Sequence, residues 1–275
     1  MIRTWSGRRW WLAAVLVLST VVACPALSRA EAGDGGVHWT AALGVGARPD
    51  YEGSDRYKAI PIGGLKARWD SGQYAELSGT ESSGSAVRLS GNLLADSQFE
   101  LGPVLQYRLS RADVESNLVD AMKNVDSAIE GGFFAAWNPK PWNIGVTFAG
   151  DMSHTHDGSL LEFSGGYVDS LSPNFDLSVT LASTWASEDY NDTYFGVSAK
   201  DQTRSGLDTF GADAGFKDVG GRVKLGFGAD DWGPWKMVAT FAYFRMIGDA
   251  ADSPVVARAG DENQLFFGFG LMYQN

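Results

Sequence analysis

The sequence predicts an all-β protein, a single antiparallel transmembrane β-barrel of about 12 strands, with 10 or 14 strands as the alternatives. Three observations indicate this class. Segments with one large apolar face and one small or polar face recur along the chain, and short connections alternate with longer, more charged ones. After residue 30 no stretch reaches the roughly 20 apolar residues of a spanning helix, so a place in a membrane requires a closed barrel.

An export signal precedes the strands. Arginines near the start are followed by the apolar run 10–23, and Ser28 and Ala30 offer small residues at the two positions that a signal peptidase reads. We therefore expect residues 1–30 to be a cleaved signal peptide and residues 31–275 to form the outer-membrane β-barrel domain.

Two other signals overlap the same segment. The run Val21-Val22-Ala23-Cys24 looks like a lipoprotein box that would leave Cys24 lipidated, and Arg8-Arg9 resembles the start of a twin-arginine signal. Cleavage after Ala30 instead removes the single cysteine of the chain, so we expect neither a disulfide nor thiol chemistry.

The overall charge limits the partners. The formal net charge of −11 argues against nucleic acid and against anionic surfaces. Gly-rich phosphate loops, basic stripes and heptads are absent from the sequence. The 34 glycines and 12% aromatic residues suit a chain of many strands and turns.

Alternation places the strands. In chain order we expect them over residues 37–47, 57–69, 73–79, 85–94, 99–110, 128–137, 142–152, 160–168, 175–185, 219–229, 235–247 and 263–275. The closing strand shows the pattern well, because Leu265, Phe267 and Phe269 alternate with small residues. Pro61 and the glycines after it predict a bulge or bend in the second strand.

The connections between these strands follow a rule of their own. Every second one is a short turn, at 70–72, 95–98, 138–141, 169–173 and 230–234, and the others, at 48–56, 80–84, 111–127, 153–159, 188–216 and 248–262, are longer on average and more charged. Short periplasmic turns and long outer loops are typical of an outer-membrane barrel, and an even strand number puts both termini in the periplasm. Tryptophans near strand ends fit interfacial girdles, at Trp69, Trp137, Trp142, Trp185, Trp232 and Trp235.

The inward faces of the strands carry both signs of charge. The residues are Lys66, Arg68, Glu76, Arg88, Glu100, Arg108, Glu130, Asp151, Glu162, Asp176, Arg222 and Lys224. Such side chains can pair across a lumen narrower than that of a 16-stranded porin, which predicts a partly filled interior. A narrow channel stays open as an alternative.

The three histidines are the candidates for chemistry. His154 and His156, flanked by Ser153 and Ser159, offer either a nucleophile with its base, as in a lipid hydrolase, or two metal ligands. His38 lies far away in sequence. We expect instead a polar loop between two strands, and hence no catalytic, cofactor-binding or metal-binding residues and no enzyme activity.

Blocks spread along the chain carry a family resemblance. They are Tyr51-Glu52-Gly53-Ser54 with Tyr57 and Pro61, Tyr194-Phe195-Gly196-Val197, Ser205-Gly206-Leu207, Gly215-Phe216-Lys217-Asp218-Val219, Asp249-Ala250-Ala251-Asp252-Ser253-Pro254 and Asn263-Gln264. In their order and spacing they resemble the MltA-interacting protein (MipA/OmpV) family of outer-membrane proteins.

The resemblance implies a barrel in the bacterial outer membrane that acts as a scaffold between a murein transglycosylase and a murein synthase. It offers no catalytic residues or cofactors, and it leaves a narrow solute channel or a surface adhesin as alternatives. The remaining partners would be outer-membrane lipid and the insertion machinery, which reads the C-terminal strand. Asn275 stands where such barrels place a terminal aromatic residue, so we expect Tyr273 to serve in its place.

The two longest connections of the C-terminal half are expected to fold inward as a cap. The segments 194–207 and 249–254 mix aromatic and apolar residues with aspartates, which suits packing over a barrel mouth better than free solvation. Asp249 or Asp252 would accept hydrogen bonds from loop backbone, or from Arg222 or Arg245. The alternative is a pair of mobile, antigenic loops.

Overall fold

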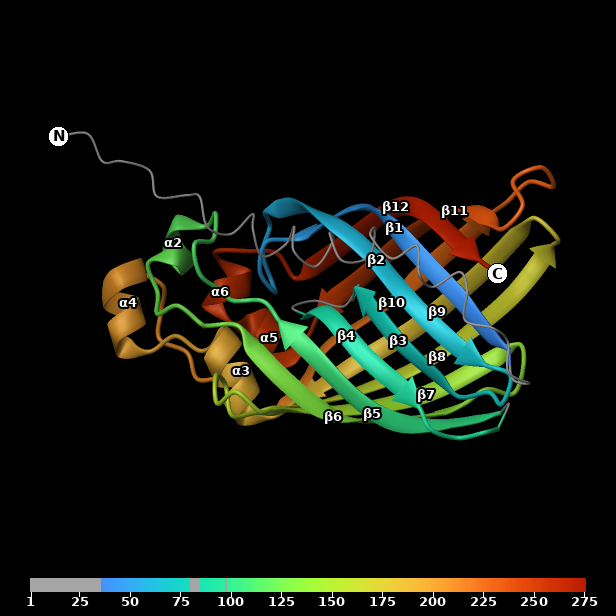
Figure 1. Ribbon diagram of the computed structural model, residues 1–275. Coiled ribbons are helices and arrows are strands. Elements are labelled where there is room, and N and C mark those ends of the chain that lie inside the picture. The colour runs from blue at the N-terminus through green and yellow to red at the C-terminus, as the bar shows by residue number, and fades with distance from the viewer. Residues whose placement is uncertain (1–35, 80–84, 97) are drawn as a thin grey trace. The chain divides into compact units, whose positions relative to one another are not determined.

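The computed structural model describes residues 36–79, 85–96 and 98–275, and twelve strands in it close into one barrel (Figure 1). The strands are β1 (Val37–Pro49), β2 (Tyr57–Trp69), β3 (Tyr74–Gly79), β4 (Ser85–Asn92), β5 (Phe99–Arg108), β6 (Ala128–Trp137), β7 (Trp142–Asp151), β8 (Ser159–Ser172), β9 (Phe175–Ala186), β10 (Gly215–Phe227), β11 (Trp235–Met246) and β12 (Asn263–Gln274). Each strand pairs antiparallel with its neighbours in sequence, and β1 pairs with β12 to close the ring. The predicted fold class and strand number are confirmed.

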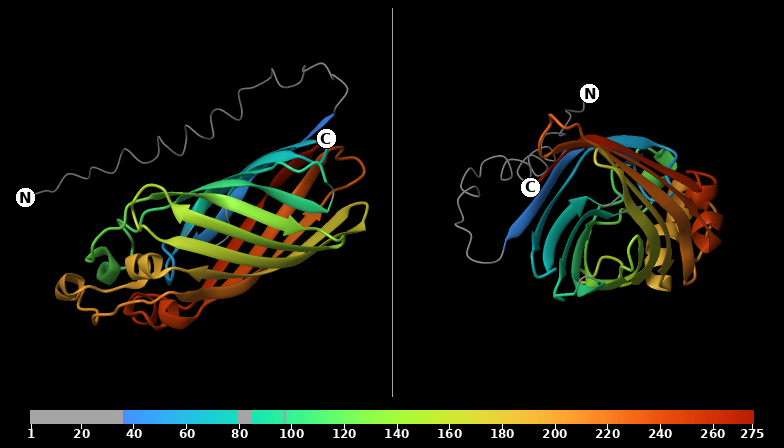
Figure 2. Two further views of the ribbon diagram at one scale, coloured as in Figure 1. Left: turned by 90° about the horizontal axis from the view of Figure 1, so that it is seen from below. Right: turned by 90° about the vertical axis from the view of Figure 1, so that its right-hand side faces the viewer.

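The closing seam extends to the end of the chain. Leu43 of β1 lies opposite Leu271 of β12, and the backbone of Trp39 bonds Asn275 in both directions, with its N–H donating to the Asn275 side chain at 2.6 Å. The view along the axis shows the ring of strands (Figure 2). Asn275 therefore takes part in barrel closure, while Tyr273 packs edge-on against Trp235 with ring centroids 5.3 Å apart.

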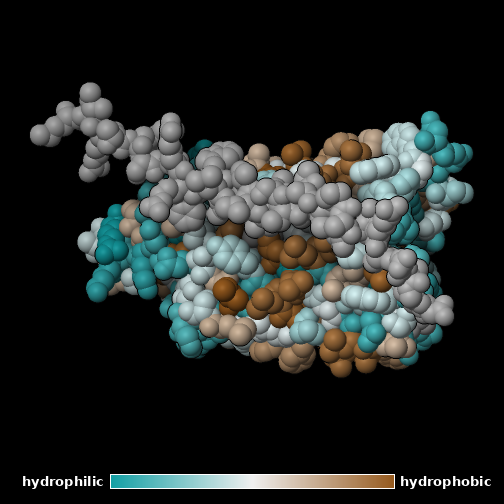
Figure 3. Space-filling model, viewed as in Figure 1, coloured by the Kyte–Doolittle hydropathy of each residue, from teal (hydrophilic) through white to brown (hydrophobic). Residues whose placement is uncertain are grey.

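The outer wall of the barrel is apolar. Its large side chains are exposed to a degree that a water-facing surface would not tolerate, for example Val45, Leu89, Phe133, Ile144, Leu181 and Phe269. On the face shown in Figure 3, hydrophobic residues occupy the middle of the wall between polar ends. The predicted apolar outer face is therefore observed, because every second residue of each strand faces the lipid.

Aromatic residues gather at the end that carries the short turns. Exposed tryptophans are found there at Trp69, Trp137, Trp142, Trp232 and Trp235. Trp142 packs edge-on against Tyr167 with ring centroids 5.1 Å apart. This arrangement is an interfacial girdle.

Helices occupy the long connections at the opposite end of the barrel (Figures 1 and 2). They are α2 (Asn117–Asp120), α3 (Glu188–Phe195), α4 (Ala199–Ser205), α5 (Gly248–Asp252) and α6 (Pro254–Ala257). They were not predicted, because each has only four to eight residues, too few to show a helical apolar period. Within the described residues, none of the helices has the length and apolarity needed to cross a membrane.

Three details of the strand predictions were wrong. The β1–β2 register runs without a shift past Pro61, so there is no bulge between these two strands. The segment 169–173 is not a turn, because β8 continues to Ser172 with a register shift near its end. β10 begins at Gly215 rather than residue 219, with a bulge beside Phe216. The predicted signal peptide and the connection 80–84 lie outside the described residues.

Candidate functional site

The long connections fold into a cap, which we define as residues 50–56, 109–127, 152–158, 187–214 and 247–262. Apolar residues from these connections form two buried clusters, and Leu160, Ala186 and Met246 at the strand ends join one of them. The members of one cluster are Tyr51, Val114, Val119, Met122, Val197, Leu207, Val255 and Ala259. The predicted cap is therefore confirmed, since a mobile loop pair would not bury residues from four separate connections together.

Backbone and side-chain hydrogen bonds join the parts of the cap. Asp249 accepts a hydrogen bond from the backbone N–H of Asp213 at 2.7 Å, as predicted for loop backbone. Arg245 pairs with Glu262 at 2.6 Å instead of with an aspartate of the cap. Tyr51 donates its hydroxyl proton to the carbonyl of Ala259 at 2.8 Å, which ties the first connection to the last.

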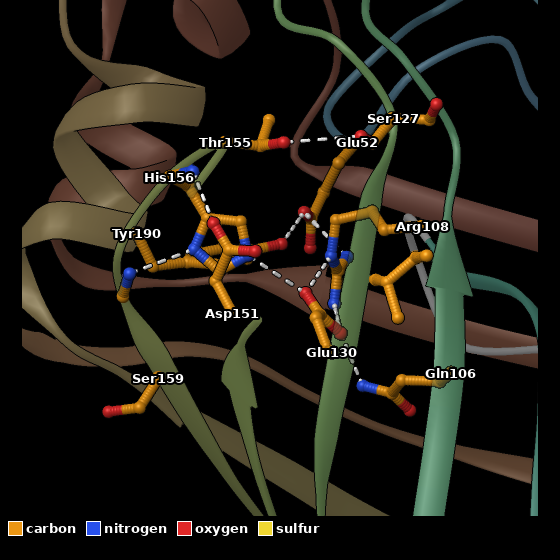
Figure 4. A network of polar contacts seen from close by, with 12 residues as sticks. Glu52, Gln106, Arg108, Ser127, Glu130, Asp151, Thr155, His156, Ser159 and Tyr190 are labelled. Carbon is orange, nitrogen blue, oxygen red and sulfur yellow. Dashed lines mark hydrogen bonds and ion pairs between the residues drawn. The ribbon is translucent and has the colours of Figure 1, made fainter. Parts of the chain in front are cut away.

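Under the cap, Glu52 is the centre of a buried polar network (Figure 4). Its carboxylate accepts hydrogen bonds from the Tyr190 hydroxyl at 2.6 Å and from the Lys217 ammonium, and Arg108 Nη1 lies 3.9 Å away. These partners belong to α3, β10 and β5, while Glu52 belongs to the β1–β2 connection. A single side chain thus links distant parts of the barrel rim to the cap.

Glu52 keeps its charge because the cations are close. Burial alone would raise the pKa of this carboxyl group, but the charges of Lys217 and Arg108 outweigh it, and the pKa of Glu52 lies below its ordinary value of 4.5. Lys217 also pairs with Asp218 at 2.5 Å, so each cation of the network has more than one anionic neighbour. The buried charges are therefore compensated.

The second half of the network lies on β5 and β6. Arg108 Nε donates to Glu130 at 2.5 Å, and Gln106 donates its side-chain N–H to the same carboxylate at 2.5 Å. His156 Nε2 lies 3.1 Å from Glu130, while its Nδ1 accepts the backbone N–H of Gly158 at 3.0 Å. Since Nδ1 accepts, the ring proton lies on Nε2 and points at the carboxylate.

Two tyrosines of α3 pack against this network. The Tyr190 ring lies edge-on to His156 with centroids 5.1 Å apart, and the Arg108 guanidinium lies 4.9 Å from the centre of the Tyr190 ring. The Tyr194 ring packs against Tyr190 at a tilt of 35° with centroids 4.6 Å apart. Burial raises the pKa of Tyr190 well above its ordinary value, although Arg108 opposes this shift. Tyr190 therefore remains a hydrogen-bond donor to Glu52.

The lumen below the network is partly filled, as predicted. Arg88 of β4 pairs with Glu162 of β8 at 3.4 Å, and these two strands are four positions apart in the ring, so the pair crosses the interior. Lys66 pairs with Glu76 at 2.9 Å on adjacent strands. The twelve inward charges predicted from alternation thus include pairs both along the wall and across it.

An apolar cluster occupies another part of the lumen. It consists of Ala242, Phe244 and Phe266 with the partly buried residues Ile60, Ile62 and Ala182. The glycines of the β1–β12 seam make room for it, since a Cβ atom at Gly268 would come within 2.6 Å of Ile62 Cδ1. Absence of a side chain on the inner face of the seam is therefore required for this packing.

The candidate catalytic residues are not assembled as a nucleophile and base. His154 is exposed with a φ of +57° and bonds Asp157 at 2.7 Å, so it lies apart from buried His156. Ser153 Oγ donates to Asp151 at 2.6 Å, and the Ser159 backbone bonds Ser187. In the described part of the chain, no group of three or more His, Cys, Asp or Glu residues could hold a metal ion.

Sequence reasoning missed Glu52, Lys217 and Tyr190 as members of one site. Glu52 and Lys217 are far apart in sequence, and only barrel closure brings them together. A signal was present, because the blocks Tyr51–Ser54 and Gly215–Val219, which carry the family resemblance, contain both residues. His156 was identified as a candidate, but it serves as a buried partner of Glu130.

Comparison with known proteins gives consistent results. The family model described as MltA-interacting protein MipA matches residues 41–275. The MltA-interacting proteins of Escherichia coli (strain K12) and Shigella flexneri are each 29% identical over 116 residues, which cover 42% of this chain and 44% of those proteins. The match therefore spans less than half the length of these relatives.

Solved structures with a similar shape are barrels. A NanC porin structure aligns with a TM-score of 0.46 and 12% identity over 85% of this chain and 98% of that one. An outer membrane channel from Pseudomonas putida F1 aligns with a TM-score of 0.43 and 12% identity over 89% and 97% of the two chains.

A closed antiparallel barrel with an apolar outer band and an aromatic girdle is the architecture of bacterial outer-membrane proteins, and the family match covers nearly all of it. The protein is therefore located in the bacterial outer membrane. With residues 41–275 matched, the chain belongs to the MltA-interacting protein MipA family.

Proposed function

We propose that this protein is a closed outer-membrane scaffold, which holds a murein transglycosylase and a murein synthase at the periplasmic face of the membrane. The position of Glu52 is the main observation in support of a closed barrel. Its carboxylate contacts β5, β10 and α3 from the β1–β2 connection, so the cap is fastened across the outer mouth of the barrel. A barrel closed in this way serves protein contacts better than passage of solutes.

The proposed murein partners are inferred from the names of the relatives. The relatives in Escherichia coli and Shigella flexneri are named for their interaction with MltA, a murein transglycosylase. Murein lies in the periplasm, and the short turns of an outer-membrane barrel face that compartment. The proposed docking face is therefore the short-turn end, and the proposed role requires no catalytic residue.

Capture of partners from cross-linked envelopes tests the scaffold. An affinity-tagged copy of the protein is expected to recover a murein transglycosylase and a murein synthase, identified by mass spectrometry. An unrelated tagged barrel expressed at the same level is the control. Recovery of neither enzyme above that control would contradict the proposed function.

A narrow channel is the second candidate, and the polar pairs on the lumen wall favour it. Lys66 with Glu76 and Lys236 with Asp176 line the interior with charge. Against it stand the Arg88–Glu162 pair, which crosses the lumen, and the apolar cluster around Phe266. Steady single-channel steps from the purified protein in a planar bilayer would favour the channel over the scaffold.

A further inference from the structure

A second concave site lies at the short-turn end, away from the cap. It is a cavity of about 520 Å³ between the start of β1, the β2–β3 turn and the β4–β5 turn, and its walls include His38, Arg68, Asp70 and Ser71. This volume lies within the range of small-ligand pockets, roughly 300–1,000 Å³. The family match begins at residue 41 and leaves His38 outside it.

The walls of this cavity are held in place by hydrogen bonds. Gly72 has a φ of +93° and donates its backbone N–H to the Trp69 carbonyl at 2.8 Å, which closes the β2–β3 turn. Asn92 donates to the Gly72 carbonyl at 3.2 Å, and Gln73 donates to the Leu93 carbonyl at 3.0 Å. Both turns are therefore fixed to each other, and the cavity between them is preformed.

The charged groups of the cavity have opposite signs. His38 Nε2 lies 3.1 Å from Asp70, with both side chains more than half exposed. Arg68 lies directly opposite His38 in the β1–β2 register and is exposed. An arginine favours a carboxylate or phosphate, and an aspartate favours an ammonium group, so the pair is suited to a zwitterion.

Strand parity shows which face of β2 supplies the arginine of the cavity. Lys66 lies over the Tyr74 ring at 3.8 Å and pairs with Glu76, inside the lumen. Arg68 follows two residues later and so shares the inner face of β2, whereas exposed Trp69 is on the lipid face. Because Trp69 and Arg68 both line the cavity, it lies at the short-turn rim of the barrel beside the membrane edge, and its arginine comes from the inner face of β2. A charged wall on the inner face favours a soluble periplasmic ligand over a lipid headgroup.

We propose that this cavity binds the zwitterionic stem peptide of murein, with a peptide carboxylate on Arg68 and a peptide ammonium on Asp70. The choice of murein rests on the proposed function, since stem peptides carry both free carboxylates and free amines. The site would keep the scaffold against the murein layer on which its partner enzymes act.

Titration calorimetry tests this with the full chain in detergent and a synthetic murein tripeptide, L-Ala-γ-D-Glu-meso-diaminopimelate. We expect saturable binding that Arg68→Gln weakens about tenfold and Asp70→Asn about threefold, as for loss of one charged contact. Arg68→Lys keeps the charge and is expected to bind more tightly than Arg68→Gln. Lys140→Gln, at an exposed cation of another turn on the same end, is the matched control and is expected to bind as wild type.

Heat-modifiable gel migration shows that each variant is an assembled barrel. Absence of binding by the wild-type chain at millimolar peptide would overturn the proposal, as would equal affinities of Arg68→Gln and Lys140→Gln. Displacement of the peptide by phosphatidylethanolamine in nanodiscs would also overturn it and assign the cavity to lipid. The titration contains no enzyme, so absence of peptide binding would not bear on the scaffold role. That role is tested separately by capture of the transglycosylase from envelopes.

Discussion

Replacement of Glu52 by glutamine is the sharpest perturbation of the cap. The amide preserves the size of the side chain and one oxygen acceptor, but it removes the charge that Lys217 and Arg108 face. Both cations are buried in the wild-type protein, so water cannot readily replace the lost carboxylate charge. We therefore expect the cap to open more often while the barrel itself remains assembled.

The size of the effect depends on the anionic partner that each cation retains. Loss of one partner from a buried ion pair costs about 3–5 kcal/mol when the other charge is left alone. Here Lys217 still pairs with Asp218, and Arg108 still pairs with Glu130. The stability lost by the cap is therefore closer to the cost of losing hydrogen bonds to a charged group, about 2–3 kcal/mol in total. At about 1.36 kcal/mol for each factor of ten, opening becomes about 30- to 160-fold more frequent.

Hydrogen exchange of the α3 amides measures this opening. The backbone N–H of Asn191 donates to Ser187 at 3.0 Å and that of Gly196 donates to Asp192 at 2.9 Å, so both report on the helix that carries Tyr190. Glu115→Gln, at an exposed cap position, is the matched control. Exchange in Glu52→Gln within twofold of wild type would refute the role assigned to Glu52.

The remaining predictions concern acid, a turn, the histidines and processing. The pKa of Glu52 lies below 4.5 in the folded protein, so its charge stabilises the cap at any pH above the pKa of the unfolded chain, and this stabilisation is lost as the pH falls through the folded pKa. Hydrogen exchange of α3 is therefore expected to accelerate in acid, and to accelerate less in Glu52→Gln. Gly53→Ala is expected to destabilise the cap by about 1–3 kcal/mol, since φ is +92° and the new Cβ would lie 2.5 Å from Val256 Cγ2; cap proteolysis at wild-type rate would contradict this. His156→Ala is expected to loosen the cap by about 1–3 kcal/mol because Glu130 loses a buried donor, whereas exposed His154→Ala leaves it unchanged in the same exchange assay. Mass spectrometry of the mature protein is expected to find Glu31 first, and a lipid on Cys24 would contradict the predicted cleavage.

The strands could be predicted because lipid imposes a strict rule on them. Every second residue must be apolar for about ten residues, and this period fixed the bounds of β2 and β6 without error. Pro61 was misleading, since a proline is tolerated wherever its missing N–H is not needed for the ladder. It pairs in register with Val45, while the described residues of β3 pair with β2 only from Gly64 onward.

The cap helices and the network were harder to predict for a different reason. α3 reads as a polar, acidic segment, and its stability comes from Tyr190 and Tyr194, which are four residues apart and share one buried face. The contacts of Glu52 join elements that are distant in sequence, so no local pattern contains them. Paired charges at inward positions could be predicted, but the partner of each could not.

Single-channel recording in planar bilayers tests the central claim most directly, because a scaffold closed by the Glu52 network should not conduct. We expect the purified wild-type protein to insert without steady current steps at either polarity. Reproducible unitary steps from the wild-type protein, absent from mock-purified membranes, would contradict the closed barrel and support a channel.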